Sequence, residues 1–302
     1  MRLALSRDNR IGIITADGFV DVSSAFDDIR YRSAKDRMPR VLGVFLDRRG
    51  QLEELVASGP AEPVPALQAP VPRPPKLIAA FGNYREGTDR ERQTQDMFLE
   101  SPDSVIGPGD TVILPGHEAT IFHHEAELAL VVGRPSKDLP ADERALEALA
   151  GYSCGIDVSG RGIGRIGPSR IGKSFDTFTP LGPAIVTTDE ISDPQDLRVT
   201  LSVNGEQRQD YSTSDMEYSV VEVLSFISSY MTLVPGDVLI LGTNHQGLGA
   251  IQDGDEVAMA IAGVGELQVN VRDPHGRDWA RGVDEEMAAR VRNRAGTASQ
   301  SA

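Results

Sequence analysis

Two acidic residues interrupt an apolar run that otherwise favours a β-strand. The segment from Phe122 to Val132 reads Phe-His-His-Glu-Ala-Glu-Leu-Ala-Leu-Val-Val, which places acids at Glu125 and Glu127. Side chains alternate between the faces of a strand, so these two acids share one face, about 7 Å apart, and His123 lies on the same face. Like charges at this separation repel unless a cation lies between them. The spacing therefore predicts a cation site beside this strand.

A third acid follows another run of small and apolar residues. Asp157 ends the sequence Gly-Tyr-Ser-Cys-Gly-Ile-Asp, which begins at Gly151. Three carboxylates form an oxygen-rich set of ligands, which is typical of sites for hard cations. We therefore expect Glu125, Glu127 and Asp157 to bind Mg²⁺ or Mn²⁺, with Ca²⁺ as a further candidate. An isolated Glu-x-Glu pair is more typical of a solvated strand face, and an isolated acid at a strand end is more typical of a turn cap.

The composition is that of a globular protein that can bury a full core. The chain has 302 residues, of which 40% are hydrophobic and 25% are charged. Its net charge of -15 argues against nucleic acid and anionic membranes as partners, because both bind basic surfaces. We expect a small anionic substrate instead, which a bound divalent cation would attract.

The single cysteine and the apolar runs favour a cytoplasmic protein. Cys154 has no second cysteine to pair with, and its small and apolar neighbours predict a buried, unreactive thiol. No apolar run approaches the roughly 20 residues that span a bilayer. The N-terminus becomes polar too early to match a signal peptide.

Short β-prone runs dominate the chain. The first 21 residues alternate such runs with turn signals, which predicts a small hairpin or meander, and prolines cluster from Pro60 to Pro75 as in an extended connector. Helical spacing is clearest at 141–150 and 220–230. Further strands are expected at 77–81, 104–106, 111–114, 126–132, 184–187, 199–203, 238–241, 256–261 and 266–271.

Five separate motifs occur in order between residues 76 and 271. They are His123–Leu128, Gly155–Arg161, Gly172–Pro183, Val203–Glu206 and Pro235–Thr243, and the pair Asn83-Tyr84 precedes them. In this order they resemble the fumarylacetoacetate hydrolase superfamily. The resemblance implies an α+β, β-rich fold with a mixed β-roll core, and it commonly implies a homodimer. With a domain boundary at the proline cluster, we divide the chain into a small N-terminal β-rich domain with its connector (1–70), a catalytic β-roll (71–275), and a C-terminal helix with a disordered tail (276–302).

The resemblance also implies roles for individual residues. It assigns the metal to Glu125, Glu127 and Asp157, the substrate oxyanion to Lys173, and substrate contacts to Arg161, Thr243, Tyr84 and Arg85. Arg161 could equally be an ion-pair partner of the acids. Thr243 could merely end a strand, and Tyr84 and Arg85 could belong to a lid or its hinge, with residues 88–99 as the lid.

Lys173 also completes a spacing that matches a phosphate-binding loop, from Gly167 to Ser174. Such a loop needs a buried strand before it and a helix after it. The flanking residues favour neither element, so we interpret the match as chance. Lys173 could otherwise be a surface lysine in a turn.

One feature of the superfamily is missing from this chain. In many members a histidine follows the Asn-Tyr pair, with a glutamate three residues later, and the two position and deprotonate water. Gly87 and Arg90 occupy those places here, and glycines stand at Gly162 and Gly164 where polar residues are common. The loop that begins at Gly242 has one extra residue and carries His245. We hypothesise that His245 supplies the missing base from the opposite wall of the site.

The sequence therefore predicts a metal-dependent hydrolase that cleaves a carbon–carbon bond in a small 2-oxo acid or β-dicarbonyl compound through a metal-stabilised enolate. A lyase or isomerase, such as a 2-oxo acid decarboxylase, tautomerase or hydratase, is the alternative, because the usual water-activating pair is absent. A third possibility is a family member that binds metal without catalysis.

Overall fold

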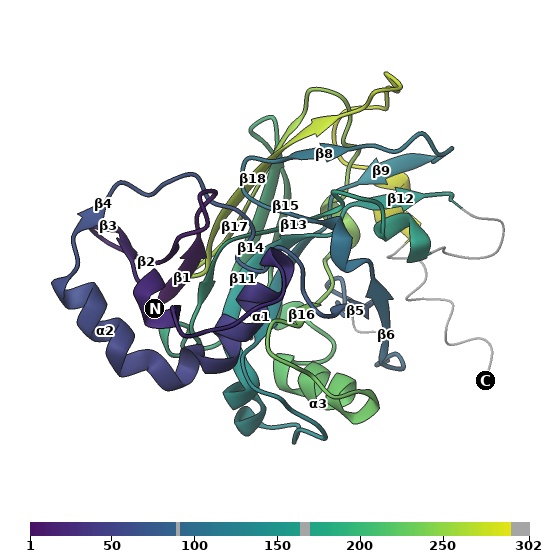
Figure 1. The fold of residues 1–302 in the computed structure, drawn as a ribbon. Coiled ribbons are helices and arrows are strands. Elements are labelled where there is room, and N and C mark those ends of the chain that lie inside the picture. The colour runs from purple at the N-terminus through teal and green to yellow at the C-terminus, as the bar shows by residue number, and fades with distance from the viewer. Residues whose placement is uncertain (89–90, 164–169, 291–302) are drawn as a thin grey trace.

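The computed structural model describes residues 1–88, 91–163 and 170–290. Within these residues the strands form a large mixed sheet, a five-stranded sheet and a two-stranded ribbon (Figure 1). Helices pack around the sheets rather than between them. The predicted α+β, strand-rich fold class is confirmed.

The large sheet has the strand order β4-β3-β2-β1-β13-β11-β10-β16-β5-β6, and β7 pairs with β13 beside this path. Its strands are β1 (Arg2–Leu5), β2 (Ile11–Thr15), β3 (Gly18–Asp21), β4 (Ala61–Glu62), β5 (Leu77–Phe81), β6 (Asp96–Glu100), β7 (Val105–Ile106), β10 (Ala126–Val132), β11 (Leu149–Ile156), β13 (Thr179–Val186) and β16 (Val238–Ile240).

The five-stranded sheet has the order β15-β14-β17-β18-β8, and β9 pairs with β12 in the ribbon. These strands are β8 (Thr111–Ile113), β9 (Ile121–His123), β12 (Ser159–Arg161), β14 (Arg198–Val203), β15 (Glu206–Ser212), β17 (Glu256–Ile261) and β18 (Gly265–Arg272). Strands β14 and β18 lie against β10, β11 and β13, so the two sheets pack face to face.

The core has two parts, one on each face of β10. Leu128 and Leu130 point into the main core between the two sheets. Ala129 and Val131 point to the other face, where Leu42 of α1 packs. This alternation follows from the period of two along a strand, and it explains why all seven residues of β10 are buried.

The helices are α1 (Ala34–Phe45), α2 (Arg49–Ser58) and α3 (Val220–Tyr230). Ser219 and Glu222 form a capping box at the start of α3. The same helix buries Val223, Leu224 and Ile227, as its predicted spacing requires. Short 3-10 helices are η1 (Ser23–Phe26), η2 (Leu46–Arg48), η3 (Pro102–Ser104), η4 (Glu143–Ala148), η5 (Arg170–Lys173), η6 (Thr188–Glu190), η7 (Thr213–Asp215) and η8 (His245–Gly247).

Most predicted elements are present, and the exceptions are instructive. The N-terminal meander and the helix at 220–230 are confirmed. The helix predicted at 141–150 is wrong, because only the 3-10 helix η4 forms there and Leu149 already begins β11. Helices α1 and α2 were not predicted. Residues 285–290 are helical, as expected for the C-terminal segment, and residues 291–302 lie outside the described part of the chain.

The N-terminal strands continue the large sheet. Leu3 of β1 lies opposite Ile185 of β13, so the sheet runs from the N-terminal segment into the strands that follow the proline-rich stretch. In Figure 1 this segment and α2 form the left side of the molecule. The domain boundary near residue 70 remains a prediction. None of the helices in the described ranges is both long and apolar enough to cross a membrane.

Candidate metal centre

Strands β10 and β11 bring the three predicted ligands to one end of the large sheet. Glu127 lies opposite Gly155 in this antiparallel pair. Glu125 precedes β10 and Asp157 follows β11, and the backbone N–H of Asp157 donates to the carbonyl of Glu125 at 2.8 Å. Three acids from separate motifs are therefore positioned by one pair of strands.

The three carboxylates form a compact, buried cluster. One carboxylate oxygen from each of Glu125, Glu127 and Asp157 lies within 4.8 Å of the other two. The residues are only 3%, 2% and 1% exposed, respectively. A hard cation is held by oxygens about 2.0–2.6 Å from its centre, so one ion can contact all three residues at this spacing.

Two cationic side chains contact the cluster. Lys173 at the end of η5 donates to Glu125 Oε2 at 2.5 Å and also to Asp157 Oδ2. Arg161 in β12 donates through Nη2 to Glu125 Oε1. Strand β12 reaches this position because it pairs with β9, with Arg161 opposite Ile121. Lys173 is thus a largely buried residue of the site and not a surface lysine.

The cluster perturbs the acid–base properties of its members. Burial raises the pKa of Glu127 well above its ordinary value, and the charge of Asp157 adds to this effect. Burial also raises the pKa of Asp157, to about 7, against the opposing charge of Lys173. Burial opposes ionisation of Glu125 too, but Lys173 and Arg161 outweigh it and hold that pKa below its usual range.

Lys173 remains protonated in this environment. Burial lowers the pKa of its ammonium group, but the charges of Asp157 and Glu125 outweigh burial and raise the pKa above its ordinary value. Lys173 can therefore act as a fixed positive charge at neutral pH, and it is poorly suited to act as a base.

Glu100, at the end of β6, is a buried acid near the cluster that the sequence did not predict. It is 5% exposed, and neither carboxylate oxygen has a hydrogen-bond partner among the described residues. Burial raises its pKa well above the ordinary value, and the charge of Asp157 adds to the effect. The N–H of Ser101 donates to Ser174 Oγ at 3.2 Å, which holds this end of β6 beside Lys173.

This set of donors fits a divalent cation. All three predicted ligands offer carboxylate oxygens, which suit hard ions such as Mg²⁺ and Mn²⁺. Asp157 Oδ1 is buried and has no hydrogen-bond partner among the described residues. Burial is the main cause of the raised pKa values of Glu127 and Asp157, and a cation bound between the carboxylates would favour their ionised form.

His245 lies beside the cluster, at the start of η8. Its Nε2 is 4.0 Å from Glu125 Oε1, and its Nδ1 is 2.7 Å from Glu86 Oε1. Glu86 is 5% exposed, and it comes from the loop that follows the Asn83-Tyr84 pair. The structure therefore brings His245 to the predicted place. Its role as a base remains a prediction, and Glu86 was not predicted at all.

Thr243 is part of a buried hydrogen-bond network. Its hydroxyl donates to the carbonyl of Ala126 at 2.8 Å and accepts from Gln209 Nε2 at 2.7 Å. Gln209 also donates to the carbonyl of Asn244 and accepts from the N–H of Ala126 and from His124. This network joins β15 to the start of β10 and to the loop of His245. The predicted contact between Thr243 and substrate is not tested by these bonds.

Tyr84 and Arg85 differ in their surroundings. Tyr84 is buried, and its ring packs edge-on against Tyr211 with the centroids 5.0 Å apart. Arg85 is exposed, and its backbone N–H donates to the carbonyl of Asp215 at 3.0 Å. Among the described residues, no contact joins the side chain of Arg85 to the acidic cluster. The substrate contacts proposed for both residues remain predictions.

The segment proposed as a lid is held against the protein where it is described, which excludes residues 89–90. Strand β6 pairs with β5 along its whole length. Arg92 donates to the carbonyl of Glu217 at 2.9 Å and to the carboxylate of Glu222 at 2.7 Å. In this structure the segment thus pairs with β5 and is hydrogen-bonded to residues at the start of α3.

His123 contacts Arg161 and is not one of the residues that form the acidic cluster. Arg161 Nε donates to His123 Nδ1 at 3.2 Å, and His123 Nε2 lies 3.0 Å from Asp284 Oδ2. Asp284 precedes the C-terminal helical turn, where it accepts from the N–H of Met287 at 2.9 Å. The C-terminal segment is therefore linked to Glu125 through His123 and Arg161.

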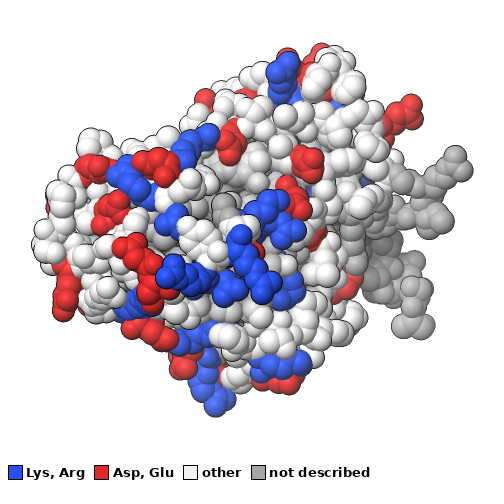
Figure 2. All heavy atoms as spheres, viewed as in Figure 1, with Lys and Arg blue, Asp and Glu red and all other residues white. Residues whose placement is uncertain are grey.

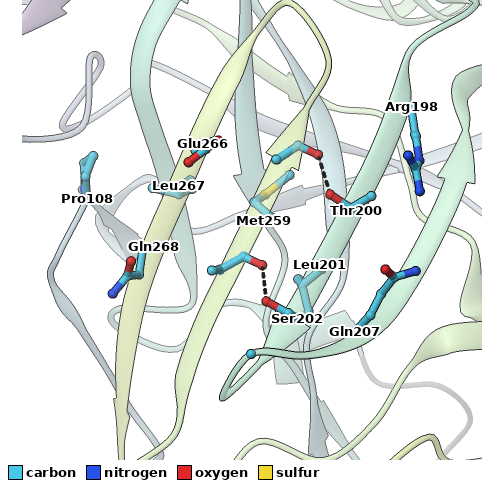
Figure 3. A pocket seen from close by; sticks show the side chains of 13 residues that line it. Pro108, Arg198, Thr200, Leu201, Ser202, Gln207, Met259, Glu266, Leu267 and Gln268 are labelled. Carbon is cyan, nitrogen blue, oxygen red and sulfur yellow. Dashed lines mark hydrogen bonds between the residues drawn. The ribbon is translucent and has the colours of Figure 1, made fainter.

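Two other grooves lie away from the acids. Arg32, Lys35, Arg40 and Arg73 line one beside α1, and Figure 2 shows basic side chains gathered in the middle of this face. The second crosses the outer face of the five-stranded sheet between Arg198 and Gln268, where Thr200 and Ser202 bond to the neighbouring strand (Figure 3). Neither groove is lined by a predicted ligand of the metal.

Comparison with known proteins finds related enzymes over most of the chain. The family model described as fumarylacetoacetate (FAA) hydrolase C-terminal matches residues 76–272. The chain is 33% identical over 294 residues to the maleylpyruvate hydrolase of Aquipseudomonas alcaligenes, and the alignment covers 90% of this chain and 99% of that protein. It is also 33% identical over 251 residues to a mitochondrial oxaloacetate tautomerase of Bos taurus, covering 76% of this chain and 79% of that protein.

A similar solved structure contains a metal. The maleylpyruvate hydrolase from Sphingobium sp. SYK-6, in complex with manganese(II) ion and pyruvate, has a TM-score of 0.81 and 32% sequence identity. The alignment covers 90% of this chain and 99% of that chain. The likeness therefore covers more of the chain than the family model, which matches residues 76–272.

Proposed function

Because the chain belongs to the fumarylacetoacetate hydrolase family, we propose that it is a divalent-metal-dependent hydrolase that cleaves a carbon–carbon bond in a small acylpyruvate or related β-dicarbonyl acid. The observation that carries this proposal is the buried cluster of Glu125, Glu127 and Asp157, with Lys173 donating to two of its members. Similarity over nearly the whole chain to enzymes named as maleylpyruvate hydrolases supports the reaction class.

Glu125, Glu127 and Asp157 are the residues that would hold the ion, which we propose to be Mg²⁺ or Mn²⁺. When bound, such an ion supplies Lewis acidity to the keto oxygen and carboxylate of a 2-oxo acid. The manganese in the similar structure supports a divalent ion of this size, and Mg²⁺ has the same preference for oxygen.

Lys173 stabilises the negative charge that develops on the substrate. It already lies against Glu125 and Asp157, and their charges keep it in the ammonium form. A cation that is fixed before the reaction needs little reorganisation when the charge develops, so this effect is often large. Arg161 adds a second positive charge on the other side of Glu125.

His245 takes the proton of the water that attacks the substrate. The water oxygen bonds to the acyl carbon, the π electrons of its carbonyl group move to the carbonyl oxygen, and the water proton passes to His245 Nε2. The carbonyl group then re-forms as the bond from that carbon to the methylene carbon breaks, and the electron pair of the broken bond forms the enolate of pyruvate. The proton held by His245 passes to the methylene carbon, which restores the base and gives a carboxylic acid and pyruvate. A positioned base of this kind contributes roughly 10²- to 10⁴-fold.

A tautomerase or isomerase is the second candidate, and the similar oxaloacetate tautomerase favours it. The same base would then move a proton between carbon and oxygen, without any attack by water. The sequence predicts this alternative because the usual water-activating pair is absent. His245 and Glu86, in contact at 2.7 Å, form another histidine–carboxylate pair, so we propose hydrolysis first.

A panel of substrates tests the proposal directly. The protein is stripped with a chelator, reloaded with MnCl₂ or MgCl₂, and incubated with acylpyruvates of different chain length and with oxaloacetate. We expect a carboxylic acid and pyruvate in equal amounts, dependent on the added ion, measured by NMR of the products. Release of CO₂ or a shifted double bond would instead identify a decarboxylase or an isomerase.

Two variants and their controls sharpen this assay. Glu127→Gln removes a ligand and should abolish turnover, and Lys173→Met should lower it by about 10²-fold or more. Glu190→Gln and Lys137→Met make the same changes at exposed positions away from the cluster and should leave turnover unchanged. Turnover that survives Glu127→Gln, or a metal-loaded protein that acts on no 2-oxo acid, would contradict the proposal.

A further inference from the structure

The loop contact beside the cluster assigns a role to a residue outside the family's usual pattern. We propose that Glu86 is the positioning residue for His245, so that two opposite loops rebuild the histidine–carboxylate pair that the chain lacks at Gly87 and Arg90. The inference rests on the proposed function and deepens it, because it names the group that orients the base.

Glu86 holds His245 at both its backbone and its ring. The backbone N–H of His245 donates to both carboxylate oxygens of Glu86 at 2.9 Å. The ring Nδ1 lies 2.7 Å from Oε1 of the same carboxylate. The side chain of Glu86 is 5% exposed and that of His245 is 25% exposed, so the carboxylate is shielded while one edge of the ring remains accessible.

The contact fixes which ring nitrogen is free. An ionised carboxylate only accepts hydrogen bonds, so Nδ1 of His245 carries the proton and donates to Glu86. In the neutral ring the lone pair is then on Nε2, which lies 4.0 Å from Glu125 Oε1. A hydrogen-bond partner on one ring nitrogen commonly decides which of the two nitrogens carries the proton and how the ring is oriented.

The backbone of Glu86 is strained in a way that fits this role. Its φ is 60°, in the left-handed region that disfavours residues with a side chain. Asp215 holds the turn by accepting from the N–H groups of Glu86 at 3.0 Å and Gly87 at 3.2 Å. Strained residues held by their surroundings cluster at functional sites. Here a glycine would remove the strain, and it would also remove the carboxylate.

The loop of His245 is tied to the same anchor. Asn244 Nδ2 donates to Asp215 Oδ2 at 3.2 Å, and Gln246 Nε2 donates to the carbonyl of Glu86. Asp215 thus joins the two loops, and of the residues on either side of His245, Asn244 bonds to Asp215 and Gln246 bonds to Glu86. The ring can therefore be held in one orientation without any bond from substrate.

The variant Glu86→Gln separates a positioning role from a merely structural one. Glutamine keeps the shape and an oxygen for the backbone N–H of His245, but its amide can also donate to Nδ1. A hydrogen bond from the amide to Nδ1 favours the tautomer that carries its proton on Nε2. In that tautomer Nε2 cannot accept a proton from water. We expect kcat to fall by about 10²-fold with KM nearly unchanged, and Glu86→Asp to restore part of the loss.

A double variant tests whether Glu86 acts through His245. In the His245→Ala background, adding Glu86→Gln should cause no further loss, because the group that Glu86 orients is already gone. Glu190→Gln is the matched control. It removes an exposed carboxylate that accepts from the N-terminal ammonium group at 2.9 Å, outside the cluster and its loops, and should leave kcat unchanged.

Nitrogen NMR reads the tautomer without any assay of turnover. The chain has 5 histidines, so a sample labelled with ¹⁵N only in histidine gives a spectrum that can be assigned with single variants. We expect the proton of His245 on Nδ1 in the unmodified protein and on Nε2 in Glu86→Gln, with Mn²⁺ binding retained in both.

Equal turnover of Glu86→Gln and the unmodified protein would overturn the inference, as would additive losses in the double variant or an unchanged tautomer. If no 2-oxo acid is turned over at all, the proposed function fails, and the tautomer still decides whether Glu86 orients His245. The two failures are therefore distinguishable.

Discussion

Lys173 and Arg161 offset only part of the negative charge that three buried carboxylates bring together. Lys173 donates to Glu125 and Asp157, so it competes with any cation that binds the same oxygens. A positive charge a few ångströms from an ion opposes its binding, even when screening is strong. Lys173 therefore lowers metal affinity while it supports the reaction.

Lys173→Met should consequently separate binding from turnover. We expect Mn²⁺ to bind about tenfold more tightly, because one competing positive charge is removed, while turnover falls. Calorimetric titration with MnCl₂ measures the affinity, and Lys137→Met is the control on an exposed lysine. Weaker Mn²⁺ binding in Lys173→Met would mean that the lysine organises the acids instead of competing for them.

Gln209 of β15 forms hydrogen bonds both to the start of β10 and to the loop that carries His245. It makes hydrogen bonds with Thr243, Asn244, Ala126 and His124. Gln209→Leu leaves several buried groups without partners and should lower the free energy of unfolding by about 2–4 kcal/mol. Chemical denaturation measures the loss. Gln207→Leu, at an exposed position of the same strand, should change it by less than about 0.5 kcal/mol, and equal effects of the two changes would refute this reasoning.

The predicted ligands were accessible from the sequence, whereas their partners were not. Glu125 and Glu127 stand out because acids are rare in a β-prone run, and ordered motifs placed Asp157 and Lys173 with them. Glu86 is an ordinary acid in a polar loop, and its role depends on a contact with a residue 159 positions away. Such a contact leaves no local pattern in the chain.

Among the secondary-structure elements, the spacing of apolar residues predicted the element correctly where one face alone is buried. Helix α3 has its apolar residues at helical spacing, and its capping box is visible as Ser219 and Glu222. Strand β11 is buried on both faces and is built from small residues, so it has no alternation. The apolar residues before it imitate a helix over 141–150, and pairing with β10 and β13 decides the outcome instead.

The cap of α3 provides a test at this scale. Ser219→Ala removes the side chain that accepts from Glu222 N–H and should lower the free energy of unfolding by about 1 kcal/mol. Thermal and chemical unfolding measure the change. Ser219→Asp keeps a cap acceptor and should recover most of the loss. A loss as large with aspartate as with alanine would show that the cap is not the source of the stability.

For the whole molecule, the sheet continues from the N-terminal strands to the strands that carry the site. The net charge of -15 gives the protein a field that repels anions, and a divalent cation held by the cluster would attract them locally. The basic residues Arg32, Lys35, Arg40 and Arg73 line another groove, which none of the three acids of the cluster lines. The sequence anticipated this charge and the strand-rich class, but not the packing of α1 against the sheet.

We also propose that the protein is a homodimer, as the superfamily resemblance implies. One chain has a mass of 32.5 kDa, so two chains give 65 kDa. Light scattering coupled to size-exclusion chromatography should report the larger mass at micromolar concentration. A mass near that of one chain, unchanged by concentration or by Mn²⁺, would refute this proposal and leave the account of the site intact.

The central claim is that Glu125, Glu127 and Asp157 bind one divalent ion that leaves room for an oxygen-bearing ligand. The most direct measurement is a crystal structure of the protein with Mn²⁺ and oxalate, with anomalous diffraction used to locate manganese. The account predicts one anomalous peak in contact with an oxygen from each of the three residues, with oxalate on the side of Lys173 and His245. A peak elsewhere, or an acidic cluster that remains without manganese at saturating concentration, would contradict it.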